Sequence, residues 1–289
     1  MYSYALSLGY RCAEDPKWFE AMERSKVRRF EFSCDGSQPP EAYAEAVGNL
    51  LEAADTGVEA ASIHIPFGNT PWVPARESER AETLEAIRGL MKVWAPLHPP
   101  RFTLHGGSEA DKELTHAEQI RALRVFLAEI LPDVEAAGTS LNIEYLPRTC
   151  LGNTPEELEE IVDGFPPDRI GICLDVNHAS PRTALMPSLI RRLGPRINSF
   201  HISDTDGVDE CHWFPGYGVV DWPACMEEIK ALDRDTLLIL EVNRLPFPQW
   251  QAAWHHNDLS ADLAAMEANV LFLENAEEFT RRRAEMAIP

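Results

Sequence analysis

Residues Ser199 to Asp221 read SFHISDTDGVDECHWFPGYGVVD. The stretch begins as an apolar strand, which contains His201, and continues into a polar loop that ends before a helical pattern. The loop contains Glu210, His212 and a Pro-Gly-x-Gly turn that starts at Pro215. A buried strand that runs into so many side chains able to bind metal indicates a functional site at its carboxyl end. The same order of strand, polar loop and helix recurs along the chain.

Eight short apolar runs alternate with helical patterns. The predicted strands are Tyr4–Leu8, Val27–Ser33, Ala60–Ile65, Arg101–Leu104, Ser140–Tyr145, Ile170–Val176, Ile197–Ile202 and Leu237–Val242. Predicted helices include Pro16–Arg24, Pro40–Ala54, Glu77–Trp94, Thr115–Ala137, Thr183–Leu193, Trp222–Leu232 and Ser260–Arg283, with a further start at Thr154 and Pro155. Such alternation predicts parallel strands joined by crossover helices.

Eight such units in 289 residues predict an α/β protein, a (β/α)₈ TIM barrel that forms a single domain over residues 1–289. A doubly wound open sheet is the main alternative. That fold usually carries a glycine-rich phosphate-binding turn after its first strand, and the residues Leu8-Gly9-Tyr10-Arg11 do not form one.

Net charge, apolar runs and cysteine spacing disfavour several classes of function. The net charge of −21 opposes binding to nucleic-acid phosphates or to anionic membranes. The chain has no apolar run of 18 residues, and we expect no membrane span and no secretory signal. Six cysteines without a C-x-x-C pair favour reduced thiols in a cytoplasmic protein.

Polar residues occur at the carboxyl ends of six consecutive predicted strands, where barrel enzymes place their active sites. These residues are His64, His105, Glu144, Asp175, His201 and Glu241. A single histidine at a strand end is more often a hydrogen-bonded core residue, but six equivalent positions together favour a site. Three carboxylates at one barrel mouth would repel one another unless a divalent cation lay between them. Carboxylate and imidazole ligands suit Zn, Mn, Fe or Co, and suit Mg or Ca less well.

Two further groups of residues have more than one interpretation. His178 could bind the metal, support a ligand or face the substrate. Glu210 and His212 could bind a further metal or the substrate, or could lie in a solvated loop. We interpret Asp204, Asp206 and Asp209 as solvated or turn-forming, because Asp-Gly is a turn dipeptide.

These residues resemble the xylose isomerase-like TIM-barrel superfamily, which includes sugar isomerases and epimerases, inosose dehydratase-like proteins and endonuclease IV. The resemblance spans the barrel from His64 to Glu241. Its most specific pieces are Ile143-Glu144, the run from Arg169 to His178, the run from Phe200 to Asp204, and the run from Pro215 to Asp221.

The resemblance implies a set of ligands but leaves the type of reaction open. In the epimerase branch one divalent metal is held at the positions of Glu144, Asp175, His201 and Glu241, and the two glutamates also act as acid and base. In endonuclease IV a cluster of three zinc ions uses further positions, which match His64, His105, His178 and His212. The remaining position is an aspartate in endonuclease IV and is Glu210 here.

Other features favour a small substrate over DNA. The basic clusters Arg24–Arg29 and Arg191–Arg196 lead into strands and should lie at the opposite end of the barrel. Trp72 and Trp213 follow strand ends and could stack on a polyol. One departure from the ketose 3-epimerases concerns the substrate-binding arginine that often follows the histidine of the seventh strand; Asp206-Gly207 occupies that neighbourhood here.

The sequence therefore predicts a metal-dependent sugar, sugar-phosphate or cyclitol isomerase or epimerase. The reaction would remove a proton next to a carbonyl and pass through a metal-stabilised enediolate. The alternatives are a keto-cyclitol dehydratase, an endonuclease IV-like phosphodiesterase that cleaves abasic DNA, and a barrel that binds metal without turnover. We expect Mn, Zn, Co or Mg as the cofactor, a small polyol or keto-sugar as the partner, and a homo-oligomer as one arrangement that the sequence allows.

Overall fold

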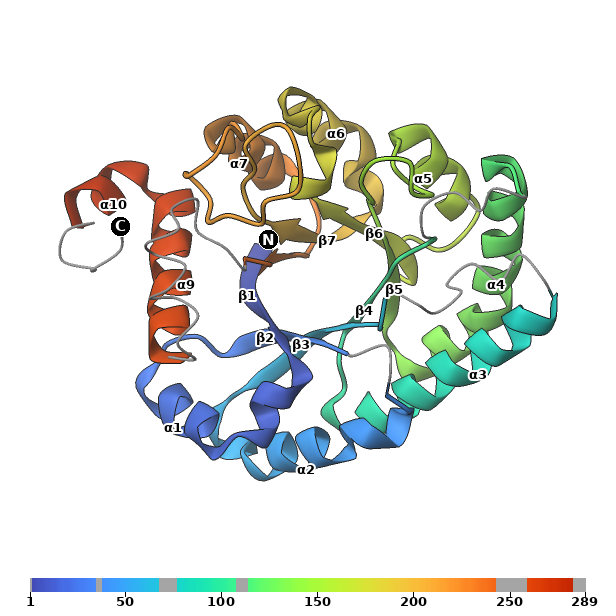
Figure 1. Cartoon of the computed structure of the whole chain (residues 1–289), viewed down its shortest axis with the longest axis horizontal. Coiled ribbons are helices and arrows are strands. Elements are labelled where there is room, and N and C mark those ends of the chain that lie inside the picture. The colour runs from blue at the N-terminus through green and yellow to red at the C-terminus, as the bar shows by residue number, and fades with distance from the viewer. Residues whose placement is uncertain (1, 35–37, 68–76, 108–113, 243–258, 283–289) are drawn as a thin grey trace.

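The computed structural model describes residues 2–34, 38–67, 77–107, 114–242 and 259–282. Eight parallel strands close into a barrel in chain order, each paired with the next and β8 paired with β1 (Figure 1). The strands are β1 (Tyr2–Gly9), β2 (Arg29–Ser33), β3 (Glu59–His64), β4 (Arg101–Leu104), β5 (Ser140–Glu144), β6 (Ile170–Asp175), β7 (Ile197–Ile202) and β8 (Thr236–Leu240). The predicted TIM barrel is confirmed.

Helices surround the barrel on the outside (Figure 1). The α-helices are α1 (Pro16–Arg24), α2 (Ala44–Glu52), α3 (Glu77–Trp94), α4 (His116–Ala137), α5 (Pro155–Val162), α6 (Met186–Leu193), α7 (Trp222–Ala231), α9 (Leu259–Glu274) and α10 (Ala276–Arg282). Short 3₁₀ helices are η1 (Tyr10–Glu14), η2 (Pro40–Tyr43), η3 (Ala54–Thr56), η4 (Ala95–Leu97), η5 (Asn177–Ala179), η6 (Thr183–Leu185) and η7 (Gly194–Arg196).

Local chemistry explains where several helices begin and end. Thr115 and Glu118 form a reciprocal capping box at the start of α4, and Gly138 ends that helix in the left-handed conformation. The Thr154 side chain accepts a hydrogen bond from the Glu157 amide at the start of α5. These boundaries agree with the sequence prediction because the caps are encoded by neighbouring residues.

Three helix predictions were too simple. The stretch predicted as one helix from Thr183 to Leu193 begins with the 3₁₀ helix η6, and α6 starts only at Met186. The stretch predicted as one helix from Pro40 to Ala54 begins and ends in 3₁₀ turns. The predicted C-terminal helix is interrupted at Asn275. The Asn275 side chain accepts a hydrogen bond from the Glu278 amide and so caps α10, which explains why one helix ends and another starts there.

The barrel wall packs apolar side chains against the helices outside it, and inside it polar side chains lie beside a small apolar cluster. In β2, Phe30 and Phe32 are fully buried and both lie against the ring of Trp18 in α1. Glu31, between them, instead contacts residues of other strands across the barrel. Side chains of a strand alternate between its two faces, so one strand supplies both the core and a polar group for the interior.

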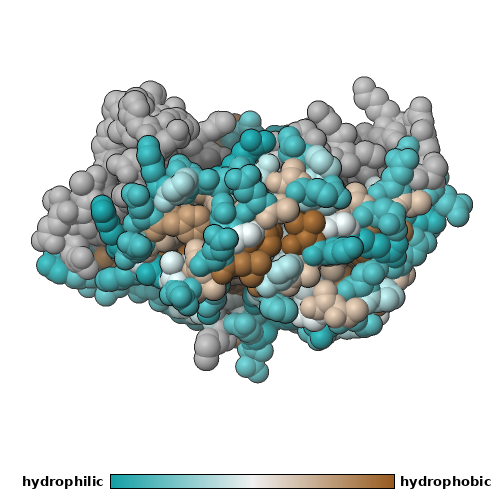
Figure 2. All heavy atoms as spheres, turned by 90° about the horizontal axis from the view of Figure 1, so that it is seen from below, coloured by the Kyte–Doolittle hydropathy of each residue, from teal (hydrophilic) through white to brown (hydrophobic). Residues whose placement is uncertain are grey.

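The basic clusters lie at the amino-terminal ends of the strands, opposite the candidate site. Arg29 begins β2 and pairs with Glu59, and Arg192 in α6 pairs with Glu156 and Glu159. Most of the outer face seen in Figure 2 is hydrophilic, with apolar residues gathered near its middle. Among the described helices, none is long and apolar enough to cross a membrane.

Candidate metal centre

The structure brings the predicted strand-end residues together at the carboxyl end of the barrel. His64, Glu144 and Asp175 are the last residues of β3, β5 and β6, and His201 lies in β7. His105 and Glu241 follow β4 and β8 by one residue. Register places Asp175 beside His201, so these two side chains lie at one level of the barrel. The convergence follows from the parallel topology, which directs every strand's carboxyl end to the same mouth.

Four of these residues form what we term the inner group: Glu144, Asp175, His201 and Glu241. Their ligand atoms all lie within 4.8 Å of one another. His201 Nδ1 lies 3.2 Å from Glu144 Oε1, 3.3 Å from Glu241 Oε2 and 3.7 Å from Asp175 Oδ2. Three of the four side chains are buried, and that of Glu241 is 25% exposed. This is the donor set of a metal site with one side open.

The inner group fits a divalent cation because three carboxylates face one imidazole and two of their buried oxygens accept no hydrogen bond among the described residues. Asp175 Oδ2 and Glu241 Oε2 are buried, and neither atom has a hydrogen-bond partner among the described residues. A buried carboxylate oxygen without a partner is costly. Burial, the largest influence, and the nearby carboxylates Asp175 and Glu144 together raise the pKa of Glu241, despite the opposing effect of His201 and His212. A bound cation would remove both the repulsion and the loss of hydrogen bonds.

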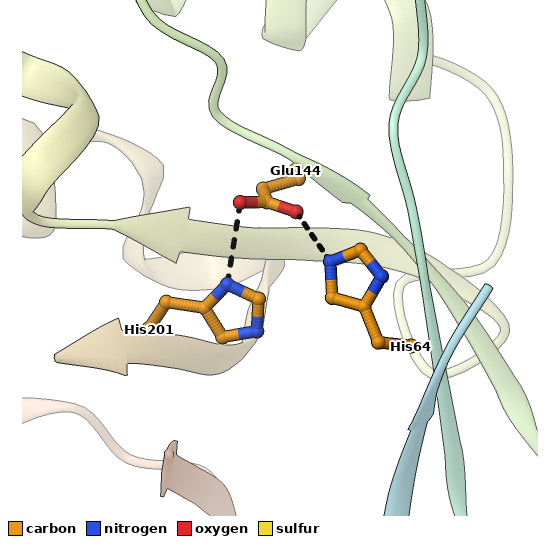
Figure 3. Close-up of side chains that lie close together, drawn as sticks. All are labelled: His64, Glu144 and His201. Atoms are coloured by element: carbon orange, nitrogen blue, oxygen red, sulfur yellow. Dashed lines mark hydrogen bonds and ion pairs between the residues drawn. The ribbon is translucent and has the colours of Figure 1, made fainter. Parts of the chain in front are cut away.

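Imidazole rings surround Glu144. Its Oε2 lies 3.2 Å from His64 Nε2 and 2.9 Å from His105 Nε2. In Figure 3 one carboxylate oxygen points toward His201 and the other toward His64. Burial opposes ionisation of Glu144, but His105 and His201 hold its pKa well below the ordinary value. Glu144 is therefore an anion at neutral pH that can bridge several cationic partners.

The histidines respond to the same carboxylates. Burial lowers the pKa of His64, but its contact with Glu144 outweighs burial and raises the pKa to about 9. Burial also opposes protonation of His201, and the surrounding acidic groups, including Cys173 and Glu31, raise its pKa well above the ordinary value. Without metal, protons therefore neutralise part of the negative charge, so metal binding would displace protons from these rings.

A second cluster, which we term the outer group, consists of His178, Glu210 and His212. Their ligand atoms also lie within 4.8 Å of one another. His178 belongs to η5 and approaches the inner group, with Nδ1 3.3 Å from Glu144 Oε1. Arg148 Nη1 lies 2.6 Å from Glu210 Oε1, so an arginine already neutralises this carboxylate. The two groups are adjacent, and their combined donors could hold more than one ion.

The loop that carries Glu210 and His212 is held by a buried aspartate. The carboxylate of Asp204 accepts hydrogen bonds from the Gly216 and Val220 amides and from the Trp222 indole. Asp204 is fully buried, so the prediction that it is solvated was wrong. The Asp-Gly dipeptide described only the local turn, which Asp206 forms by accepting from the Val208 and Asp209 amides.

Glu31 is a buried charged residue beside the site that the sequence prediction missed. Its carboxylate lies 3.1 Å from His201 Nε2. Burial opposes ionisation, but His201 is the main influence that lowers the pKa of Glu31 to about 2. The available signal was one acidic residue between two phenylalanines in a predicted strand, at a position that alternation turns away from the outer core.

The structure gives less information on the predicted contacts of Trp72 and Trp213 with a substrate. Trp72 lies outside the described residues. The main chain of Trp213 pairs with Asp204 and so fixes the loop next to His212. A cavity of about 270 Å³ lies beside the outer group, and its lining includes Arg148, Arg182 and Glu210. Contact of the Trp213 indole with a substrate remains a prediction.

Comparisons with known proteins agree with the barrel. A family model described as the xylose isomerase-like TIM barrel matches residues 4–266. An uncharacterized protein of Methanocaldococcus jannaschii is 26% identical over 66% of this chain and 67% of its own length. The inosose isomerase of Bacillus subtilis is 28% identical over 44% of this chain, and the match spans about half of that relative, 49%.

Solved structures share the whole fold. A D-tagatose 3-epimerase-like protein superposes with a TM-score of 0.72 at 23% identity, with coverage of 94% of this chain and 98% of the other. A structure titled IOLI protein with a binding zinc atom superposes with a TM-score of 0.70 at 17% identity, with coverage of 93% and 97%. At these low identities, the superpositions establish a common fold and nothing further.

Proposed function

This chain belongs to the xylose isomerase-like TIM-barrel family, and on that premise we propose that it is a metal-dependent isomerase or epimerase of a small keto-sugar or cyclitol. The inner group would hold the cation. Glu144 and Glu241 would transfer the proton next to the substrate carbonyl. Besides these two glutamates, the loop that carries His212 and Trp213 would face the substrate.

The observation that carries this proposal is the composition and geometry of the inner group. Three carboxylates and one imidazole from the ends of four consecutive strands meet within 4.8 Å, and two of the carboxylate oxygens have no hydrogen-bond partner among the described residues. An acid buried for stability alone usually has its oxygens hydrogen-bonded. The partly exposed side chain of Glu241 gives the group one side from which a substrate can approach.

The protein's own residues divide the chemistry between them. A bound divalent cation would polarise the substrate carbonyl and stabilise the negative charge that develops when the adjacent proton leaves. Glu241, whose Oε2 has no hydrogen bond among the described residues, can accept or donate a proton at that oxygen. Glu144 is held between His64 and His201, and those contacts fix the direction of its carboxylate. Two acids at one carbon, one to remove the proton and one to return it, suit isomerisation or epimerisation.

The relatives support a substrate of this class. The Bacillus subtilis relative is named an inosose isomerase, and a similar structure is described as D-tagatose 3-epimerase-like. Keto-sugars and inososes both have a carbonyl beside a carbon that bears a hydroxyl and an acidic proton. Water elimination from a keto-cyclitol begins with the same proton removal, so dehydratase activity is the nearest variant of the proposed reaction.

The outer group favours one alternative from another class, an endonuclease IV-like phosphodiesterase with several zinc ions. His178, Glu210 and His212 supply three further candidate ligands next to the inner group. Electrostatics oppose this alternative, because a net charge of −21 disfavours a polyanionic substrate. Arg148 at this mouth is paired with Glu210, which reduces its use as a phosphate contact.

Deuterium exchange tests the proposed reaction. Native protein loaded with Mn²⁺ or Zn²⁺ is incubated in heavy water with a panel of ketopentoses, ketohexoses and inososes. We expect deuterium on the carbon next to the carbonyl of at least one substrate, and no incorporation with Glu241→Gln. Failure of every panel member to exchange with metal-loaded protein would contradict the proposal. Cleavage of abasic DNA together with three zinc ions per chain would establish the alternative.

A further inference from the structure

Glu31 lies in the barrel interior beneath the inner group, and the proposed reaction gives it no role. It is in the middle of β2, on the far side of His201 from the three inner-group carboxylates, and is completely buried. A carboxylate buried in a barrel costs several kcal/mol unless polar partners compensate it. The residues that compensate the Glu31 charge therefore indicate its role.

Within the part of the chain that the structure describes, every partner of the Glu31 carboxylate is a side chain on another strand. Oε2 accepts hydrogen bonds from Ser62 Oγ at 2.8 Å and from Thr103 Oγ1 at 3.2 Å. Oε1 accepts from Ser7 Oγ at 3.2 Å and lies 3.1 Å from His201 Nε2. Three hydroxyl groups thus fix the carboxylate in position, and its remaining strong contact is with the imidazole.

His201 therefore has a carboxylate on each side of its ring. Nε2 faces Glu31, whereas Nδ1 faces Glu144, Asp175 and Glu241 at 3.2 to 3.7 Å. The Nε2 contact is an ion-pair distance without the alignment of a full hydrogen bond. A proton on Nε2 is favoured there, because an unprotonated nitrogen would face the lone pairs of an anion. Without a cation, Nδ1 also holds a proton against Glu144. When a cation in the inner group displaces that proton, Nε2 keeps its own proton against Glu31, and the Nδ1 lone pair is directed to the cation.

We propose that Glu31 is the positioning residue of the metal centre: held by Ser7, Ser62 and Thr103, it fixes His201 as the Nε2–H tautomer and presents Nδ1 to the cation. This inference rests on the proposed metal function of the inner group. A carboxylate behind a ligating histidine orients the ring and increases its basicity, and loss of such a partner typically weakens metal binding about 10- to 100-fold. Glu31 has no contact with a substrate in this arrangement, so it is not a catalytic residue.

The test compares the metal affinities of two variants, each altered at one of two neighbouring residues in the barrel interior. Glu31→Gln keeps the shape of the side chain and removes its charge, whereas Ser62→Ala removes one supporting hydroxyl and leaves the carboxylate opposite His201. Zn²⁺ and Mn²⁺ affinities are measured on metal-free protein by competition with a chelator, and thermal unfolding monitors the fold. We expect Glu31→Gln to bind metal about 10- to 100-fold more weakly and Ser62→Ala to change affinity by less than about threefold.

The outcomes separate this inference from the proposed function. Native protein without affinity for any divalent ion would overturn both. Native protein that binds metal tightly, with Glu31→Gln equal to it within about twofold, would overturn the role of Glu31 alone. If Glu31→Gln does not fold, nitrogen-edited NMR of zinc-loaded native protein decides, with His201→Asn used to assign the signal. We expect a proton on His201 Nε2 and metal at Nδ1, and metal at Nε2 would overturn the inference.

Discussion

The inner and outer groups have similar ligands but different supports. Glu144, Asp175 and His201 belong to strands of the barrel. Glu210 and His212 belong to the loop between β7 and α7, where His212 has a φ of 46°. A non-glycine residue in the left-handed region is strained, and such strain is often retained at functional sites. The barrel thus fixes most of the inner ligands, whereas two of the three outer ligands, Glu210 and His212, depend on a loop that the buried carboxylate of Asp204 helps to organise.

This difference suggests how one fold can serve several chemistries. We propose that the inner group decides whether a cation binds at all, because its geometry is part of the barrel. We propose that the outer group decides how many cations bind or how a substrate is held, because its loop can change without disturbing the strands. The following predictions test that division, from the largest expected effect to the smallest.

Substitution of Glu144 should have the largest effect, because this residue belongs to the inner group and also contacts His64, His105 and His178. Glu144→Gln should reduce the rate of the proposed reaction about 10³-fold or more and weaken binding of the first metal ion. Steady-state kinetics and metal titration measure both. The exposed Glu135→Gln on α4 is the matched control and should change neither. Native activity and metal content in Glu144→Gln would remove the inner group from the mechanism.

Substitution of Asp204 should destabilise the outer loop. Asp204→Asn places an amide opposite several buried donors and should lower the free energy of unfolding by about 2 to 4 kcal/mol. Chemical denaturation measures this loss. Asp206→Asn is the control at an exposed turn and should cost less than about 1 kcal/mol. Affinity for the first metal ion should stay near the native value in both variants, and a large loss in Asp204→Asn would mean that the two groups are not independent.

Substitution of His212 should affect only a second metal ion. Asparagine tolerates the left-handed conformation, so His212→Asn removes the ligand with little change of backbone strain. A second equivalent of Zn²⁺, if native protein binds one, should weaken about 10-fold or more, while the first stays within about threefold. Isothermal titration resolves the two. Equal weakening of both would contradict separate sites.

Substitution of Arg148 should have the smallest effect, and it should strengthen metal binding instead of weakening it. Arg148 pairs with Glu210 and is about half exposed, so the pair contributes at most about 1 kcal/mol. Arg148→Met should release Glu210 and strengthen binding of a second cation by up to about fivefold. Arg169→Met, at the opposite end of the barrel, should leave it unchanged. Weaker binding in Arg148→Met would show that the arginine supports the outer site.

The sequence was sufficient for features that repeat or that neighbours encode. The alternation of strands and helices predicted the barrel, and the position of Glu144, Asp175 and Glu241 at strand ends predicted their convergence. Residues whose role depends on distant partners were harder to identify. Glu31 is defined by Ser62, Thr103 and His201, which lie on three other strands.

Asp204 was misjudged for a related reason. Its partners include the Val220 amide and the Trp222 indole, 16 and 18 residues further along the chain. Only the fold of the loop brings those donors to one carboxylate, so the local sequence indicated a turn and not a buried anchor. The break of the C-terminal helix at Asn275 depended on a cap that helical periodicity does not reveal.

The central claim is that the inner group holds a divalent cation. Anomalous scattering from crystals of native protein loaded with Mn²⁺ tests it most directly, because the signal locates the ion independently of any assumed ligand. We predict a peak about 2.0 to 2.3 Å from His201 Nδ1 and from carboxylate oxygens of Glu144, Asp175 and Glu241. A fully loaded crystal with its manganese elsewhere, and none among these four residues, would contradict the account.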